Sequence, residues 1–99
     1  MNSLLPKEVF KLAAEVVERN IAAGRTIVTA ESCTGGLVAS AITEIAGSSA
    51  VLQAGFVTYS NEAKIKTLKV SEELIDTFGA VSIAVAWAMA QGALKRSSA

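Results

Sequence analysis

Apolar residues recur at helical spacing in the first quarter of the chain. On one face of residues 9–21 they are Val9, Leu12, Ala13, Val16, Val17 and Ile21. Pro6 suits the first turn of such a helix, and Gly24 suits its C-terminal end. The pattern therefore predicts an amphipathic helix that lays one face on a core.

Two short stretches with the composition of strands follow, separated by another helical pattern. Residues 26–30 and 51–59 are the strand candidates, the second one weakened at Gly55. Residues 37–45 between them carry an apolar helical stripe that closes at Gly47. Strand, helix and strand in this order predict an α/β layer with a parallel pair, although the sequence leaves the direction of the second strand open.

Serine residues mark the starts of three more helices. Ser60 can cap a helix over residues 61–68, Ser71 one that ends at Gly79, and Ser82 a last helix that reaches about Lys95. The expected fold class is therefore α/β, a single domain over residues 1–99 in which helices pack on a small, partly parallel sheet. Two strands leave unpaired edges, and short chains cover apolar surface poorly, so we expect a homo-oligomer rather than a stable monomer.

Composition and charge remove several classes of function. The nine basic and nine acidic residues cancel, so no net positive field favours nucleic acid. The longest nearly apolar stretch, residues 80–90, is shorter than the roughly 18–20 residues that span a bilayer, so no membrane partner is expected. The single cysteine cannot form an internal disulfide, which makes the cytoplasm the expected location.

The chain has no histidine, which narrows the possible chemistry. Ser-His and Cys-His catalytic pairs are excluded, and so is the commonest ligand of catalytic zinc. We therefore expect no metal and no other cofactor. Any nucleophile in this chain must be activated by a group other than imidazole.

Candidate chemistry is concentrated in residues 30–36, which read AESCTGG between the first strand and the next helix. Such a junction can present a nucleophile or hold an anion at the helix start, and it can equally be a turn that merely passes close to a neighbour. Ser32 can be a nucleophile or a simple capping residue. Cys33, without a histidine to form a thiolate, is expected to be a buried packing residue.

A second string, GFVTYSNEAK at residues 55–64, adds a lysine one turn into a predicted helix. A lysine there lies near the positive end of the helix dipole, and shielding from water would favour the neutral amine that a base requires. Taken alone, Lys64 can also be a solvated surface residue, and Tyr59 a half-buried strand residue. Trp87 and Met89 in the last helix are expected to pack in the core.

Together with IAGSS at residues 45–49 and FGAVS at residues 78–82, these strings resemble the C-terminal domain of the competence/damage-inducible CinA family, the nicotinamide mononucleotide deamidases. The resemblance runs from about residue 26 to residue 95. It implies that Ser32 is the catalytic serine, Lys64 its base and Tyr59 a proton relay or a stacking surface for the pyridine ring.

The resemblance also implies a substrate and its binding groups. The expected reaction is an amide hydrolysis that converts nicotinamide mononucleotide, a small-molecule nucleotide, into nicotinic acid mononucleotide and ammonia, a step of pyridine nucleotide salvage. Thr34, Gly35 and Gly36 would offer backbone donors to an oxyanion or a phosphate. Glu31 would orient Lys64 or hold a ribose hydroxyl. Alternatively, its side chain can cap backbone groups of its own turn.

A non-catalytic interaction module is the alternative function. Family domains continue after the last helix with further strands and a glycine-rich turn, so the resemblance covers the first half to two thirds of such a domain. In addition, family members more often have glycine at the position of Lys69 and an acidic residue at that of Ile83. In this interpretation the chain keeps the core and lacks half of the pocket.

Overall fold

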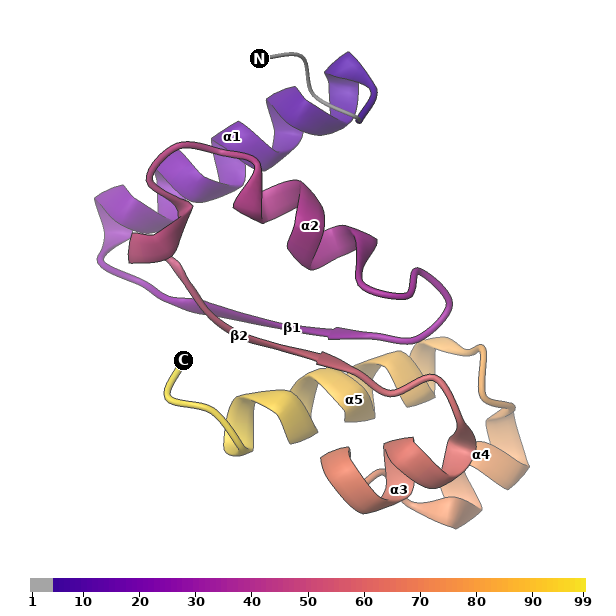
Figure 1. Ribbon diagram of the computed structural model, residues 1–99. Coiled ribbons are helices and arrows are strands. Elements are labelled where there is room, and N and C mark those ends of the chain that lie inside the picture. The colour runs from indigo at the N-terminus through magenta and orange to yellow at the C-terminus, as the bar shows by residue number, and fades with distance from the viewer. Residues whose placement is uncertain (1–4) are drawn as a thin grey trace.

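The computed structural model describes residues 5–99 as an α/β fold in which two helical layers enclose a small sheet (Figure 1). This confirms the predicted fold class. The elements in chain order are α1 (Lys7–Ala23), β1 (Ile27–Glu31), α2 (Leu37–Thr43), the 3-10 helix η1 (Ser48–Ala50), β2 (Leu52–Val57), α3 (Asn61–Leu68), α4 (Glu72–Phe78) and α5 (Ile83–Lys95).

The sheet consists of β1 and β2, which run parallel, so the direction that the sequence left open is settled. Val28 pairs with Ala54 and Glu31 with Val57, and the register shifts between Ile27 and Val28. β2 is shorter than predicted and ends at Val57. Both strands therefore end at the same edge of the sheet.

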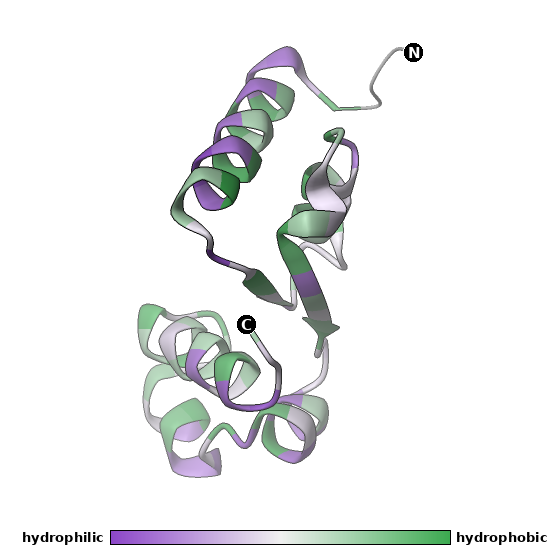
Figure 2. Ribbon diagram, turned by 90° about the vertical axis from the view of Figure 1, so that its left-hand side faces the viewer, coloured by the Kyte–Doolittle hydropathy of each residue, from purple (hydrophilic) through white to green (hydrophobic). Residues whose placement is uncertain are grey.

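The core is divided between the two faces of this sheet. On one face α1 and α2 pack around a buried cluster, and in Figure 2 the hydrophobic side of α1 is turned toward α2. On the other face α3, α4 and α5 form a second cluster against the sheet. The first cluster consists of Ala13, Val17, Ala41, Ile42, Ile45 and Val51. The second consists of Leu68, Val70, Ile75, Val85, Met89 and Ala93.

The predicted helix ends agree with the structure to within a few residues. α1 starts one residue later than predicted, because Pro6 is its N-cap rather than part of its first turn, and Gly24 closes it with a φ of 67°. The side chains of Ser60, Ser71 and Ser82 each accept a backbone hydrogen bond at a helix start, as predicted. Caps of this kind satisfy N–H groups that have no partner inside the helix.

The last helix corrects one expectation. Met89 is buried, as expected, but Trp87 is 67% exposed. The hydrophobic face of α5 is used by Val85, Met89 and Ala93, and Trp87 lies on the opposite side of the same helix. Within residues 5–99, none of the helices has the length and apolarity needed to cross a membrane.

Candidate active site

The two strand ends bring the predicted catalytic segments together. Glu31 is the last residue of β1, and Val57 pairs with it as the last residue of β2. Ser32 therefore leaves the sheet beside Thr58, whose N–H donates to the carbonyl of Glu31 at 2.9 Å. In an open parallel sheet this carboxyl edge is the usual place for a ligand site.

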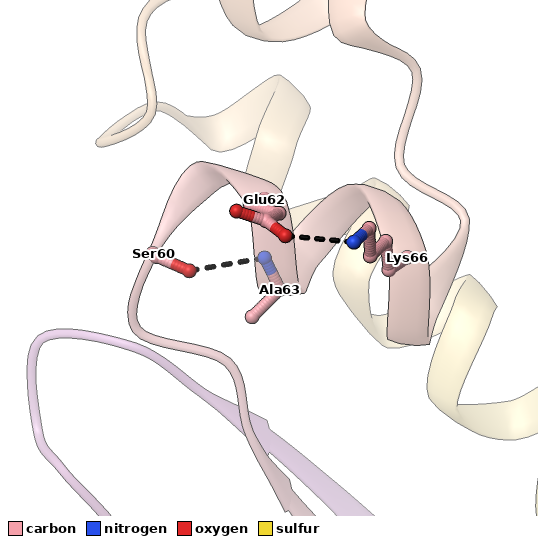
Figure 3. A network of polar contacts seen from close by, with 4 residues as sticks. All are labelled: Ser60, Glu62, Ala63 and Lys66. Carbon is pink, nitrogen blue, oxygen red and sulfur yellow. Dashed lines mark hydrogen bonds and ion pairs between the residues drawn. The ribbon is translucent and has the colours of Figure 1, made fainter.

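Local polar contacts fix the first turns of α3, the helix that carries Lys64, and Figure 3 shows two of them. Ser60 caps the helix by accepting a hydrogen bond from the Ala63 N–H at 3.0 Å, and Glu62 and Lys66 form an exposed ion pair at 2.7 Å. The Lys64 N–H donates to the carbonyl of Ser60 at 3.1 Å. The helix thus begins directly after Tyr59 and Ser60, and its buried side carries Lys64 toward the strand ends.

Lys64 and Ser32 are in direct contact. The Lys64 side chain is 2% exposed, and its Nζ lies 2.9 Å from the Ser32 Oγ and 2.8 Å from the carbonyl oxygen of Tyr59. The Ser32 hydroxyl also donates to that carbonyl, at 3.3 Å. Neither partner of the Lys64 amine is a carboxylate, which is unusual for a buried lysine because such charges are normally paired. A buried amine held against a hydroxyl is the geometry of a nucleophile and its base.

Tyr59 takes part in the cluster through its backbone. Its carbonyl oxygen receives hydrogen bonds from both Lys64 and Ser32. Its side chain is 73% exposed. A role of the phenol as a proton relay or a stacking surface stays a prediction, whereas the carbonyl holds the two catalytic candidates in place.

The carboxylate of Glu31 lies at the start of α2, and none of its described contacts is to Lys64. Its carboxylate accepts hydrogen bonds from the Thr34 hydroxyl at 2.6 Å, the Val38 N–H at 2.7 Å and the Ala39 N–H at 3.0 Å. Burial alone would raise the pKa of Glu31, but hydrogen bonds from Thr34, Ala39, Val38 and Gly36 outweigh it and hold the pKa below its ordinary value. These contacts are those of a residue that caps the start of a helix, which is one of the two roles expected for Glu31. A contact of Glu31 with substrate stays a prediction.

The backbone donors of the turn are unequally available. The Gly35 N–H donates to the Ser32 carbonyl at 3.0 Å, and the Gly36 N–H helps to stabilise the Glu31 carboxylate. The Thr34 N–H has no hydrogen-bond partner among the described residues. Of the three residues predicted to bind an oxyanion or a phosphate, Thr34 therefore has the amide that is free to do so.

Cys33 is exposed, so the expectation that its thiol is buried in packing was wrong. The turn between β1 and α2 directs Glu31 toward α2 and Ser32 toward Lys64, and the next residue lies at the tip of the turn in solvent. Sequence reasoning treated a lone cysteine as a small apolar residue, which holds inside elements but not at the tip of a turn.

A cavity of about 250 Å³ lies next to the Ser32 turn. It is lined by residues 30–34, by residues 80–82 before α5, and by Val38, Ala86 and Met89. The contribution of residues 80–82 was not predicted, although the FGAVS string and the Ser82 cap mark the segment in the sequence. Within residues 5–99 there is no group of three or more His, Cys, Asp or Glu side chains placed to hold a metal ion.

Comparison with known proteins places the chain in a family. The model of the CinA C-terminal domain matches residues 9–99, so the chain belongs to the CinA C-terminal domain family. It is 53% identical over 92 residues to the nicotinamide-nucleotide amidohydrolase PncC of Escherichia coli strain K12, covering 93% of this chain and 56% of that protein. It is also 47% identical to a CinA-like protein of Shewanella sediminis, over 93% of this chain and 22% of that one.

Solved structures agree with this assignment. The competence/damage inducible protein CihA of Agrobacterium tumefaciens superposes with a TM-score of 0.94 at 53% identity, covering 99% of this chain and 59% of that chain. A CinA superfamily protein of Escherichia coli superposes with a TM-score of 0.86 at 38% identity, over 97% of this chain and 60% of that one. The chain thus spans little more than half of these solved relatives, and of the Shewanella relative about a fifth.

Proposed function

We propose that the chain is an amidohydrolase that converts nicotinamide mononucleotide into nicotinic acid mononucleotide and ammonia. The observation that carries the proposal is the contact of 2.9 Å between the buried Lys64 amine and the Ser32 hydroxyl. The proposal is also supported by the sequence identity of 53% between this chain and a protein named as a nicotinamide-nucleotide amidohydrolase. In the same proposal the reaction takes place in the cytoplasm and needs no cofactor.

The chemistry follows from a hydrogen bond whose direction can reverse. When the Lys64 amine is neutral, its lone pair can accept the Ser32 proton across the same contact. The Ser32 Oγ then attacks the carboxamide carbon, the carbon–nitrogen bond breaks, and the protonated Lys64, directly or through the Tyr59 hydroxyl, returns its proton to the leaving ammonia. Water, deprotonated by Lys64, hydrolyses the acyl-enzyme, which restores the Ser32 hydroxyl and releases the carboxylate product.

The developing oxyanion needs donors that are not already used inside the protein. Thr34 offers such an amide, close to Ser32 in sequence and beside the cavity. Its hydroxyl is bonded to Glu31, which orients the turn. A donor held in place before the reaction stabilises the transition state without the cost of reorganisation.

A non-catalytic interaction module remains the second candidate. The observation in its favour is coverage, because the match spans 56% of the Escherichia coli amidohydrolase. In this case the contact between Ser32 and Lys64 would persist as a structural feature without turnover.

The test is release of ammonia from nicotinamide mononucleotide by the purified chain, with nicotinic acid mononucleotide identified as the second product. Ser32→Ala should abolish the reaction, whereas Cys33→Ala, which removes an exposed thiol one residue away, should leave it largely intact. A chelator should have no effect. Loss of activity in Cys33→Ala but not in Ser32→Ala would assign the nucleophile to the thiol, and an inactive chain would favour the interaction module.

A further inference from the structure

A second cavity lies where α3 ends, α4 begins and α5 ends. It has a volume of about 290 Å³ and shares no lining residue with the cavity beside Ser32. This volume is close to the lower end of the range found for sites that bind small molecules. The cavity is therefore a separate candidate site, in a part of the fold that the proposed reaction does not use.

Three cations and no carboxylate line this cavity, which we call the basic pocket. Lys69 is the C-cap of α3, Lys95 is the last residue of α5, and Arg96 follows it. The Arg96 Nη1 donates to the carbonyl of Gly92 at 3.2 Å, and none of the three cations forms an ion pair within the described residues. The negative ends of α3 and α5 offset only about half a charge each, so the pocket keeps a positive excess.

The backbone of Lys69 adds a second observation. Its φ is 58°, and it is the only non-glycine residue with a positive φ in the part of the chain that the structure describes. A side chain in this left-handed conformation costs free energy, and residues held in this way concentrate at functional sites. Glu72 and Glu73, the carboxylates next to Lys69 in sequence, lie in the first turn of α4 and do not line the pocket.

Neutral donors complete the lining. The Ser71 Oγ accepts a hydrogen bond from the Leu74 N–H at 3.4 Å, which leaves the hydroxyl proton for a ligand. The side-chain amide of Gln91 also lines the pocket and has no hydrogen-bond partner among residues 5–99. Lysine and arginine together with hydroxyl and amide donors are the groups that proteins use to bind phosphate.

We propose that the basic pocket binds a small molecule that carries a diphosphate, either inorganic pyrophosphate or the diphosphate of a nucleotide. Lys69 from α3 and Lys95 and Arg96 from α5 contact the phosphates, and Ser71 and Gln91 donate to the remaining oxygens. A single phosphate would leave part of the positive charge without a partner. The inference stands on the pocket and on the backbone of Lys69, and it does not require that the chain is an enzyme.

The test is calorimetric titration of the purified chain with pyrophosphate, inorganic phosphate and adenosine diphosphate. We expect pyrophosphate to bind at least about tenfold more tightly than phosphate, and its affinity to fall as salt is added. The backbone amide signals of Lys69, Gln91 and Lys95 should shift in NMR spectra during the titration. Adenosine diphosphate that binds as tightly as pyrophosphate would identify a nucleotide as the ligand, and weaker binding would identify the inorganic diphosphate.

Lys69→Gly should weaken pyrophosphate binding at least about tenfold, because it removes one cation from the pocket. Glycine suits the left-handed backbone, so this variant should fold at least as well as the parent chain. Lys66→Gln is the control, since it removes the same charge from an exposed position on the same helix outside the pocket, and it should bind as the parent chain does. Unchanged affinity in Lys69→Gly, an equal loss in Lys66→Gln, equal affinity for phosphate and pyrophosphate, or NMR shifts confined to the Ser32 turn would each overturn the proposal.

Discussion

The carboxylate of Glu31 is the anion that occupies the start of α2. Glu31 is 5% exposed, and its carboxylate accepts hydrogen bonds from the Thr34 hydroxyl and from backbone amides at the start of α2, those of Val38 and Ala39 among them. This arrangement fixes the turn that carries Ser32, so Glu31 acts on the candidate nucleophile through the backbone. Charged acceptors of this kind form stronger hydrogen bonds than neutral ones.

The first prediction concerns the charge of Glu31. Glu31→Gln keeps the shape but places an amide against N–H donors, and we expect it to lower the free energy of unfolding at pH 7 by about 2 kcal/mol. The pKa of Glu31 in the folded protein is below its ordinary value of 4.5. The higher free energy of unfolding of the parent chain is therefore fully present above pH 4.5 and is lost as the pH falls through the folded-state pKa. Denaturant titrations of both proteins across pH 3–7 measure this, and a difference that does not depend on pH would contradict it.

The backbone conformation of Lys69 lowers the stability of the fold. It is the C-cap of α3 and has a φ of 58°, the left-handed conformation that favours glycine. Lys69→Gly should therefore stabilise the fold by about 0.5–1 kcal/mol, because the strain of a side chain in this conformation disappears. Thr67→Gly, inside the same helix, should destabilise it by a similar amount. Thermal unfolding of the two variants checks the opposite signs, and equal signs would refute the explanation.

Residue patterns predict side-chain chemistry better than backbone contacts. Ser32 and Lys64 could be named because the strings that carry them resemble those of the CinA family, whereas the residues taken alone also allowed a capping serine and a surface lysine. The Tyr59 carbonyl that holds both could not, since any residue at that position offers the same oxygen. The exposure of Cys33 depends on which way the turn points, and local sequence does not fix that direction.

Most elements were predictable because their ends have clear chemical markers. Serine caps and glycine stops define α1, α3, α4 and α5 almost to the residue. The region after α2 was less clear, because residues 48–50 form a short 3-10 helix where the apolar pattern is interrupted. The pairing and direction of β1 and β2 depend on contacts between residues far apart in the sequence. The spacing of apolar residues within each strand does not predict such contacts.

Packing between elements makes Gly92 an exception to helix propensity. It lies inside α5, where alanine would normally be preferred by about 1 kcal/mol. A Cβ at this position would come within 2.1 Å of the Leu68 carbonyl oxygen at the end of α3. We expect Gly92→Ala to destabilise the fold by roughly 1–3 kcal/mol, because the backbones of α3 and α5 must separate.

Ala90→Gly is the control for this prediction. Ala90 is exposed in the same helix, so its replacement should cost about 1 kcal/mol through propensity alone. Chemical denaturation of both variants gives the comparison. A Gly92→Ala variant more stable than the parent chain would show that α3 and α5 do not approach so closely.

At the scale of the whole molecule, the catalytic candidates and the basic pocket lie in different parts of the fold. The Ser32 and Lys64 contact is formed entirely by residues 5–99, at the carboxyl ends of the strands. The basic pocket lies between the C-terminal ends of α3 and α5 and contains none of the residues of that contact. Sequence analysis predicted both helices from their serine caps, whereas the pocket became visible only when the ends of α3 and α5 were placed next to each other.

Lys64 is the base of Ser32 in the proposed mechanism, and an arginine at this position separates a base from a positive charge. Arginine keeps the charge but is not deprotonated in proteins, so Lys64→Arg should abolish ammonia release from nicotinamide mononucleotide as completely as Lys64→Met. Lys66→Arg, at an exposed position two residues away, should retain the parent rate. The decisive measurement is this initial rate for the parent chain and the three variants, each shown to be folded by circular dichroism. An active Lys64→Arg variant would contradict the serine–lysine mechanism.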